Sequence, residues 1–539
     1  MKPYNEIIFI DRSKNMKLIP SEGKNTANYW CSWRNQRFFM PNAFLHMRTY
    51  DIPNHDIVQR EMLSDEFLFG KRGVLSEYMQ DVRKDMYVVL DDGWDVPYNG
   101  DYYAFGSLIL NEERFPYGGK TPAENLAILN KKILDLGYAG TGLWVPMSCI
   151  GETKDEPFSL DQFKEYWIER AKWLSYAGIA YLKVDWGIHE RDVDYRRALT
   201  EIFKEYAPDV TVEHAILDSW FFNPNDDKEK LANTLKISDT FRCYDVKFDF
   251  NSVTSLGRAH AMLTLDCDMD YDCGGIINVG EEPYLAASLG CTMGIMSHPL
   301  LRGSIITMLP SDIMKNGISK QATLKSEFHS FDHYQRALRW QRIAPAMTFK
   351  KGETVSSNEW LTDSWTYEKE PYPYTQNAYA GKSIRQTAPK IVARNTSLPE
   401  ILDTRPRHYL MEHHPYVVAS VNRETGVYTI ATLPRTIDGI MNCTTPEVDI
   451  AARGISADKC FGVFGLYRSL TLEFDRCIEG MRLFGGDILL DEQKDITDLE
   501  GVHIEGNTLR LDGALLSQIG LEGAAFHDIA DPGSVFKLV

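Results

Sequence analysis

The sequence lacks the features that mark membrane proteins and secreted, disulfide-rich domains. None of its 539 residues fall in an apolar run of about 18, the length a membrane-spanning helix needs. The apolar stretch near the start, Ile7–Ile10, is too short for the apolar region of a signal peptide. The nine cysteines form an odd, scattered set with no CxxC pair, which is typical of reduced thiols. We therefore expect a cytoplasmic protein.

Positive charge is also in short supply. The chain has 58 Lys and Arg against 76 Asp and Glu, and its net charge is −18. Nucleic acids and anionic membranes attract basic surfaces, so neither is an expected partner. The sequence contains no Walker loop, no G-x-S-x-G and no H-E-x-x-H. We therefore expect no metal and no cofactor.

Short apolar runs alternate with longer helical patterns from residue 25 to residue 345. The expected strands are Tyr87–Leu90, Gly142–Pro146, Ile179–Val184, Val210–Glu213 and Leu235–Ile237. Capping residues predict helices over 121–134 and 159–176. Alternation of this length predicts a parallel α/β fold and favours a (β/α)8 TIM barrel over an open sheet.

The pattern changes twice after the expected barrel. Residues 351–405 are polar and rich in Tyr, Pro, Thr and Asn, which is typical of a linker or of an excursion beside the barrel. Short alternating strands follow from 406 to 539, and Asn422–Gly426 between two of them predicts a hairpin. We expect a catalytic barrel at 1–350, an irregular segment at 351–405 and a C-terminal all-β sandwich at 406–539.

Acidic residues follow the expected strands, whose C-terminal ends form the active face of a parallel barrel. Asp91 and Asp92 come directly after Tyr87–Leu90. They form either a pair that binds a ligand or part of a strand-to-loop turn. Lys183 and Asp185 share one face of their strand because the side-chain period is two. A lysine beside a carboxylate favours its ionised form, which a glycosidase nucleophile requires. The alternative for this pair is a buried ion pair that closes the barrel end.

Two further acidic groups allow more than one interpretation. Asp239 follows an expected strand and is a candidate proton donor, although Ser-Asp also caps helices, and Asp245 and Asp249 are its rivals. Asp268 belongs to the alternating series Asp266–Asp272, which departs from a calcium loop in the places of its glycine and its final glutamate. We interpret this series as a strand-end cluster that faces the substrate.

Taken in order, these segments resemble the α-galactosidase clan, glycoside hydrolase families 27 and 36. The matching segments are Tyr29–Trp33, Asp91–Trp94, Lys183–Asp185, Ser238–Asp239, Asp266–Met269, Gly280–Glu282 and Ser297–Leu300. The resemblance implies a retaining mechanism with Asp185 as the nucleophile and Asp239 as the acid/base. It also implies a set of substrate-binding residues, namely Trp33, Asp91, Asp92, Lys183, Glu213 and Asp268.

The sequence departs from this family pattern in several places. Leu235 stands where family 27 has an arginine, four residues before the acid/base, and Lys236 or Arg242 is a candidate substitute. Trp186 follows the nucleophile, where it could narrow the sugar pocket. The large N-terminal β-domain of family 36 is missing from the sequence. These departures concern the identity of the sugar more than the fold.

The resemblance implies removal of a terminal α-linked galactose, or a close galacto-configured sugar, from an oligosaccharide or glycoconjugate. On the same site, α-N-acetylgalactosaminidase, β-L-arabinopyranosidase and transglycosylase activities stay open. A non-catalytic carbohydrate-binding barrel is an alternative from another class. A lyase or isomerase that uses Lys183 as its base is a further one. The sequence also leaves open whether the chain forms a homo-oligomer.

Overall fold

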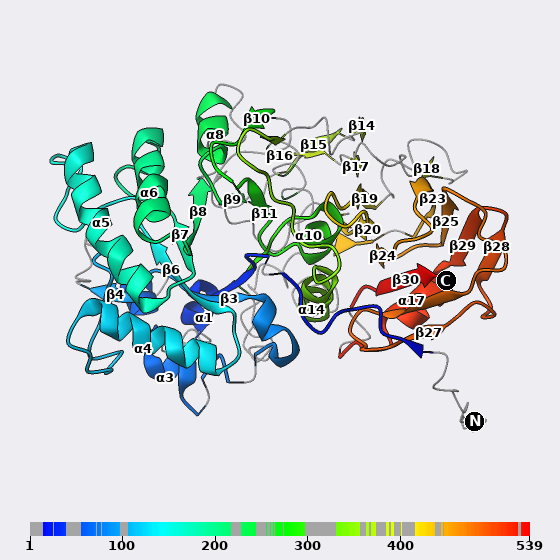
Figure 1. Cartoon of the computed structure of the whole chain (residues 1–539), viewed down its shortest axis with the longest axis horizontal. Helices are drawn as coiled ribbons and strands as arrows, with labels where there is room; N and C mark the ends of the chain where they lie inside the picture. Colours follow the sequence, from blue (N-terminus) through cyan, green and yellow to red (C-terminus); the bar gives the residue numbers. More distant parts are fainter. Residues whose placement is uncertain are drawn as a thin grey trace.

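The structure, a computed structural model, consists of a (β/α)8 barrel and a β-sandwich that lie side by side (Figure 1). The residues it describes are 15–24, 26–38, 55–71, 73–76, 78–96, 106–216, 228–243, 255, 259, 262, 265–272, 274–296, 330–355, 363–365, 368–372, 384–387, 390–392, 400–401, 415–436, 443–445, 447–525 and 530–539. No helix within these ranges is long and apolar enough to cross a membrane.

Eight parallel strands form the barrel. They are β2 (Tyr29–Cys31), β3 (Tyr87–Leu90), β6 (Gly140–Val145), β7 (Tyr181–Val184), β8 (Thr211–Ile216), β9 (Thr240–Cys243), β11 (Ile276–Asn278) and β12 (Gly294–Ile295). Each strand pairs with the next one in the chain, and β12 pairs with β2. A parallel bridge between Asn278 and Thr292 closes the ring between β11 and β12. All eight strands therefore end at one edge, which we call the C-terminal edge of the barrel.

Helices cover the outside of this ring. The ones used below are α4 (Pro122–Asp135), α5 (Leu160–Ala177), α6 (Val193–Tyr206), α8 (Lys228–Leu235), α10 (Pro283–Leu289) and α14 (Ser330–Trp340). Thr121 caps α4, and Ser159 forms a capping box with Gln162 at the start of α5. Gly178 ends α5 in a left-handed conformation, with φ of 67°. The predicted limits of these two helices are confirmed to within one residue.

The expected strand Leu235–Ile237 is wrong. Leu235 is the last residue of α8, and the strand of this region, β9, begins only at Thr240. Leu231 and Leu235 are one helical turn apart and both are buried, so they form the inner face of a helix. A run of three residues with two apolar ones fits either structure. As a consequence, Asp239 lies at the start of a strand and not at the end of one.

Two sheets form the sandwich. The larger one contains, in order, β1 (Asn15–Met16), β27 (Gln493–Asp495), β26 (Leu483–Asp487), β30 (Gly533–Leu538), β24 (Phe461–Phe464), β20 (Tyr428–Leu433), β19 (Tyr416–Val421), β17 (Lys390–Val392) and β14 (Asp363–Trp365). The smaller one contains β18 (Glu400–Ile401), β23 (Asp449–Ile455), β25 (Ser469–Phe474), β29 (Thr508–Asp512) and β28 (Val502–Glu505). The larger sheet thus includes one strand from the N-terminal region and two from the segment 351–405.

The hairpin predicted at Asn422–Gly426 is confirmed. It joins β19 to β20, which pair in antiparallel fashion, and Gly426 takes a positive φ of 70°. The segment after Asp512 is a helix, α17 (Gly513–Gly520), so the C-terminal region also contains a helix.

Strand β19 of the larger sheet is buried on both faces. Along β19, Tyr416 and Val418 pack into the core shared with the barrel, whereas Val417 and Ala419 pack into the core between the two sheets. This alternation follows from the side-chain period of two. Helices α10 and α14 lie between barrel and sandwich (Figure 1).

A fully buried ion pair also joins the two parts of the chain. Arg336 on α14 donates two hydrogen bonds to Asp487 of β26, at 2.9 and 2.8 Å. A guanidinium and a carboxylate that meet in this bidentate way hold a fixed relative orientation. The barrel and the sandwich therefore form a continuous structure.

Candidate active site at the C-terminal edge of the barrel

Asp185 lies directly after β7, at the C-terminal edge, and its side chain is almost fully buried. One carboxylate oxygen accepts a hydrogen bond from the indole Nε1 of Trp144 at 3.0 Å, and the other accepts one from the backbone N–H of Trp186 at 3.0 Å. The ammonium nitrogen of Lys183 is 3.6 Å from the same carboxylate. Two donors and a cation around one carboxylate favour its ionised form, which is the form that acts as a nucleophile.

The strand register explains why these groups meet. Lys183 is two residues before Asp185, so both side chains point to the same side of β7. On the neighbouring strand β6, Trp144 is in register with Lys183. The indole of Trp144 therefore lies beside Lys183 and reaches the carboxylate of Asp185, which is two residues further along the chain. A hydrogen bond between residues on two strands fixes the rotamer of Asp185 from outside its own strand.

Lys183 also joins Asp185 to the first acidic pair. Its ammonium nitrogen is 2.7 Å from a carboxylate oxygen of Asp91, which also accepts a hydrogen bond from the thiol of Cys31 at 2.8 Å. Burial by itself lowers the pKa of Lys183, but the negative groups around it, Asp91 first and then Cys31 and Asp185, together outweigh burial, and the net pKa is well above the ordinary value. Lys183 is therefore a permanent cation, which argues against its use as a general base.

The carboxylate of Asp92 contacts an arginine and not Lys183. It pairs with Arg60, whose Nη2 is 2.6 Å away, on α2 (His55–Glu61). Burial raises the pKa of Asp92 to about 7, although Arg60 lowers it, and Asp91 and Asp95 add to the increase. The second carboxylate oxygen is buried and has no hydrogen-bond partner among the described residues.

Trp33 begins the short helix α1 (Trp33–Phe38) just after β2, so it also belongs to the C-terminal edge. The guanidinium carbon of Arg60 lies 6.0 Å from the centre of its ring. Trp33, Asp91, Asp92, Lys183 and Asp185 are therefore brought to one edge of the barrel by three different strands and the loops that follow them.

Glu213 is placed differently from its prediction. It lies in the middle of β8 and is fully buried inside the barrel. Its carboxylate accepts hydrogen bonds from the hydroxyl groups of Tyr29 at 2.9 Å and Tyr181 at 2.6 Å, and from the amide of Asn278 at 2.9 Å. Burial raises its pKa, although nearby Arg242 lowers it. These contacts assign Glu213 to the barrel core, and they do not support its predicted contact with substrate.

Asp239 lies at the opposite edge from Asp185. It precedes β9, and one carboxylate oxygen accepts a hydrogen bond from the backbone N–H of Val212 at 3.0 Å, near the start of β8. The other oxygen is 2.7 Å from the ammonium of Lys204, in the last turn of α6. The prediction that Asp239 ends a strand is thus wrong, and the structure does not bring it to Asp185.

Asp268 is also far from the C-terminal edge. It lies on β10 (Cys267–Asp268), which pairs with β13 (Thr354–Val355), and its side chain is exposed. The chain around it runs beside the start of β9, where the N–H of Asp270 donates to the carbonyl of Lys236 at 3.0 Å. The seventh barrel strand, β11, begins only at Ile276. The predicted position of Asp268 at a strand end facing the substrate is therefore wrong.

Part of the predicted site lies outside the described residues. This part comprises Asp245, Asp249 and the segment Ser297–Leu300. In the sequence, Asp245 comes two residues after the last residue of β9. Among the described residues, no group of three or more His, Cys, Asp or Glu is arranged to hold a metal ion.

Arg196 is a functional candidate that the sequence did not indicate. Its guanidinium is fully buried on α6 and donates to the backbone carbonyls of Asp185 at 3.3 Å and Ala215 at 3.1 Å. Its Nε donates to the carbonyl of Glu190 at 2.7 Å. Burial lowers the pKa of Arg196 to about 10, so the group still carries its charge at neutral pH. A buried cation one peptide away from Asp185 favours a negative charge there. In sequence it is one of many helix arginines, and no local pattern marks it.

The chain was compared with known proteins. No protein-family profile and no curated protein matches the sequence. A family GH27 β-L-arabinopyranosidase from Geobacillus stearothermophilus is 10% identical, with a TM-score of 0.33 over 69% of this chain and 94% of that one. A Bacteroides fragilis protein described as an α-galactosidase/melibiase is 9% identical, with a TM-score of 0.32 over 70% and 78%.

Proteins of other chemistry are similar to the same degree. A homocysteine methyltransferase from Escherichia coli is 14% identical, with a TM-score of 0.28 over 54% of this chain and 96% of that one. A shared barrel architecture does not define an activity, because unrelated reactions use the same fold. What this chain does has to be argued from its site.

Proposed function

We propose that the chain is a retaining exo-glycoside hydrolase that releases a terminal α-linked galactose, or a close galacto-configured sugar. The observation that carries this proposal is the setting of Asp185. A single carboxylate at the C-terminal edge is fixed by Trp144 and the N–H of Trp186, with Lys183 next to it. The order of the sequence motifs around it supports the choice of sugar.

In the proposed reaction Asp185 attacks the anomeric carbon of the terminal sugar. The bond to the leaving sugar breaks as a glycosyl–Asp185 ester forms, and a proton is delivered to the leaving oxygen. Water then attacks the same carbon and gives a proton to the group that donated one in the first step, and the carboxylate of Asp185 leaves with its electron pair. Two displacements at one carbon restore the original configuration.

The sugar would be held by the polar groups at the same edge. Asp91 and Asp92 follow β3 and Trp33 follows β2, so all three lie at the C-terminal edge. Buried carboxylates are strong acceptors for sugar hydroxyls, and a flat ring covers the apolar face of a pyranose. Lys183 has a different role in this account, because its ammonium contacts both Asp91 and Asp185 and holds the two carboxylates in place.

The proton donor of this reaction needs a second carboxylate at the C-terminal edge. Asp239 is unsuited because it lies at the start of β9 and pairs with Lys204. Asp245 and Asp249 follow the end of β9 in sequence, and we propose that one of them donates the proton. Replacing each of them by Asn in turn distinguishes the two. The variant that lacks the proton donor should regain activity on substrates with a good leaving group, because these need no proton on the leaving oxygen.

A screen of nitrophenyl glycosides, with proton NMR of the first sugar released, tests the function. The expected result is cleavage of the α-galactoside and initial appearance of the α-anomer. α-N-acetylgalactosaminides and β-L-arabinopyranosides in the same screen distinguish the alternatives for the sugar. Cleavage of no glycoside would exclude the hydrolase, and initial appearance of the opposite anomer would exclude the retaining mechanism.

A further inference from the structure

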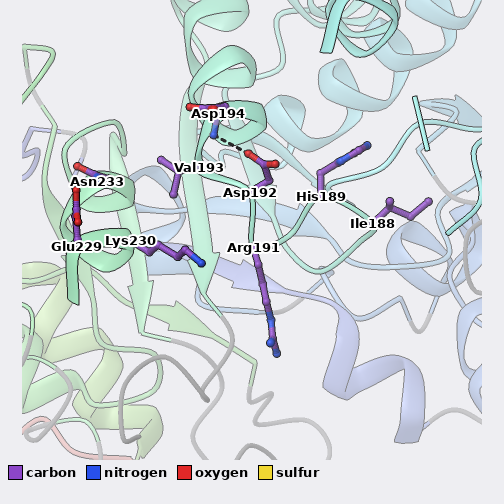
Figure 2. A pocket seen from close by; sticks show the side chains of 9 residues that line it. All are labelled: Ile188, His189, Arg191, Asp192, Val193, Asp194, Glu229, Lys230 and Asn233. Carbon is purple, nitrogen blue, oxygen red and sulfur yellow. Dashed lines mark hydrogen bonds between the residues drawn. The ribbon is translucent and has the colours of Figure 1, made fainter. Parts of the chain in front are cut away.

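A polar crevice with a volume of about 600 Å³ opens beside the loop that follows Asp185 (Figure 2). One wall consists of this loop, from Ile188 onward, and the first turn of α6. Glu229, Lys230 and Asn233 of α8 form the other wall. Barrel helices run antiparallel to the strands that they cover, so the first turns of α6 and α8 lie at the C-terminal edge. The crevice is therefore on the same edge as the proposed nucleophile.

The wall formed by the loop is tied to Asp185 by hydrogen bonds. The carbonyl of Trp186 accepts from the N–H of Met147 at 2.9 Å, and the N–H of His189 donates to the carbonyl of the same Met147 at 2.9 Å. Arg196 bonds the carbonyls of Asp185 and Glu190, one at each end of the loop. A group bound in the crevice would thus keep a fixed distance from the nucleophile.

The His189 side chain adds a further clamp to this loop. Its ring nitrogen is 3.0 Å from the carboxylate of Glu152, which follows β6. The ring stacks on Tyr195 with centres 3.8 Å apart and planes 6° from parallel. Because Tyr195 covers one face of the ring and little of His189 is exposed, the crevice offers no open aromatic face for an aryl group.

The crevice is lined by both hydrogen-bond donors and hydrogen-bond acceptors. Arg191 and Lys230 supply donors, and both side chains extend away from the helices toward the strand ends (Figure 2). Asp192 and Asp194 supply carboxylates on the wall of α6. Sugar hydroxyls both donate and accept, so a mixed lining of this kind suits a polyhydroxylated ligand.

Other ligand classes fit the lining less well. A phosphate or sulfate would meet the carboxylates of Asp192, Asp194 and Glu229. An apolar group would find only Ile188 and Val193 to pack against. A metal cation would be opposed by the charges of two basic side chains. A neutral saccharide is the class that this combination of groups favours.

We propose that the crevice binds the second sugar of the substrate, the unit from which the terminal sugar is released. This inference rests on the proposed hydrolase function. The terminal sugar sits over Asp185 at the barrel mouth, so the rest of a longer substrate has to leave across the rim. The crevice lies at that rim, between the loop that follows β7 and helix α8, which precedes β9. The chain is thus selective for oligosaccharides over glycosides with an aryl leaving group.

The test compares two substrates with the same terminal sugar, 4-nitrophenyl α-galactoside and an α-galactosyl-terminated trisaccharide. The variants are the wild type, the double variant Arg191→Ala with Lys230→Ala, and the control Lys228→Ala. Lys228 is an exposed lysine on the same helix as Lys230 but does not line the crevice. The measured quantity is the ratio of kcat/KM for the trisaccharide to kcat/KM for the aryl substrate.

The double variant should lower this ratio at least about tenfold, the effect of losing one charge-assisted hydrogen bond. Lys228→Ala should keep the wild-type ratio. A wild-type ratio in the double variant, or an equal drop in the control, would overturn the crevice assignment and leave the hydrolase proposal standing. If the wild type cleaves neither substrate, the hydrolase proposal itself fails for galactosides, and the crevice assignment fails with it.

Discussion

The two edges of the barrel both carry aspartates next to short strands, yet the aspartates differ in their surroundings. At the C-terminal edge, Asp91 and Asp185 are buried and share the buried cation Lys183. At the opposite edge, Asp239 pairs with Lys204, whose side chain is 30% exposed. Buried charges need partners in a fixed geometry, whereas surface pairs are optional. In the proposed function, chemistry belongs to the first edge and structural support to the second.

The largest expected difference between the edges is in turnover. Asp185→Asn should lower kcat at least about a thousandfold, because it removes the nucleophile. Asp239→Asn should change kcat no more than a few-fold, because its hydrogen bonds to Val212 and Lys204 are remote from the reaction. Steady-state rates on an activated aryl galactoside provide the measurement. Equal losses in both variants would remove the distinction between the edges.

A second difference should appear in folding stability. Lys183→Met leaves the buried carboxylate of Asp91 without its cation, which should cost about 3–5 kcal/mol of unfolding free energy. Lys204→Met breaks a partly exposed pair, so its cost should be about 0–1 kcal/mol. Urea unfolding at pH 7 gives both values. A cost for Lys204→Met as large as that for Lys183→Met would show that burial does not separate these two pairs.

A third expected difference concerns the pH dependence of stability, through Asp92. Burial raises its pKa in the folded chain to about 7, against 3.8 for the ordinary group. The folded state therefore binds this proton more tightly than the unfolded state does. The stability that Asp92 contributes is complete below about pH 4 and is lost as the pH rises to about 7.

Unfolding free energies of the wild type and Asp92→Asn, measured from pH 4 to pH 8, test this sign. The advantage of the wild type over the variant should shrink with rising pH, by up to about 1.4 kcal/mol per unit, and level off above pH 7. A gap that widens with rising pH would mean that the ion pair with Arg60 outweighs burial and that the pKa of Asp92 is lowered.

Local signals were enough to predict much of the fold. The caps Thr121 and Ser159 and the end at Gly178 set the limits of α4 and α5, because each cap involves residues within a few positions. The apolar run Tyr87–Leu90 matches β3 in full. The turn at Asn422–Gly426 likewise depends on a nearby glycine with positive φ. Such interactions can be recognised from the sequence alone.

The site was predicted less completely because its contacts are remote in sequence. The hydrogen bond from Trp144 to Asp185 joins residues 41 positions apart, and the pair of Arg60 and Asp92 joins residues 32 apart. No local pattern indicates either contact. The placement of Asp239 failed for another reason, since an aspartate next to an apolar run looks the same before and after a strand. Only the three-dimensional position of β9 resolves it.

The most direct test of the account is to find where a glycosyl group becomes attached during turnover. A slowly hydrolysed fluorosugar with a good leaving group should form an ester that survives proteolysis and mass spectrometry. The account predicts that the added mass lies on Asp185 and that Asp185→Asn abolishes it. A label on another carboxylate, or turnover of such substrates by Asp185→Asn at the wild-type rate, would contradict the assignment of Asp185 as the nucleophile.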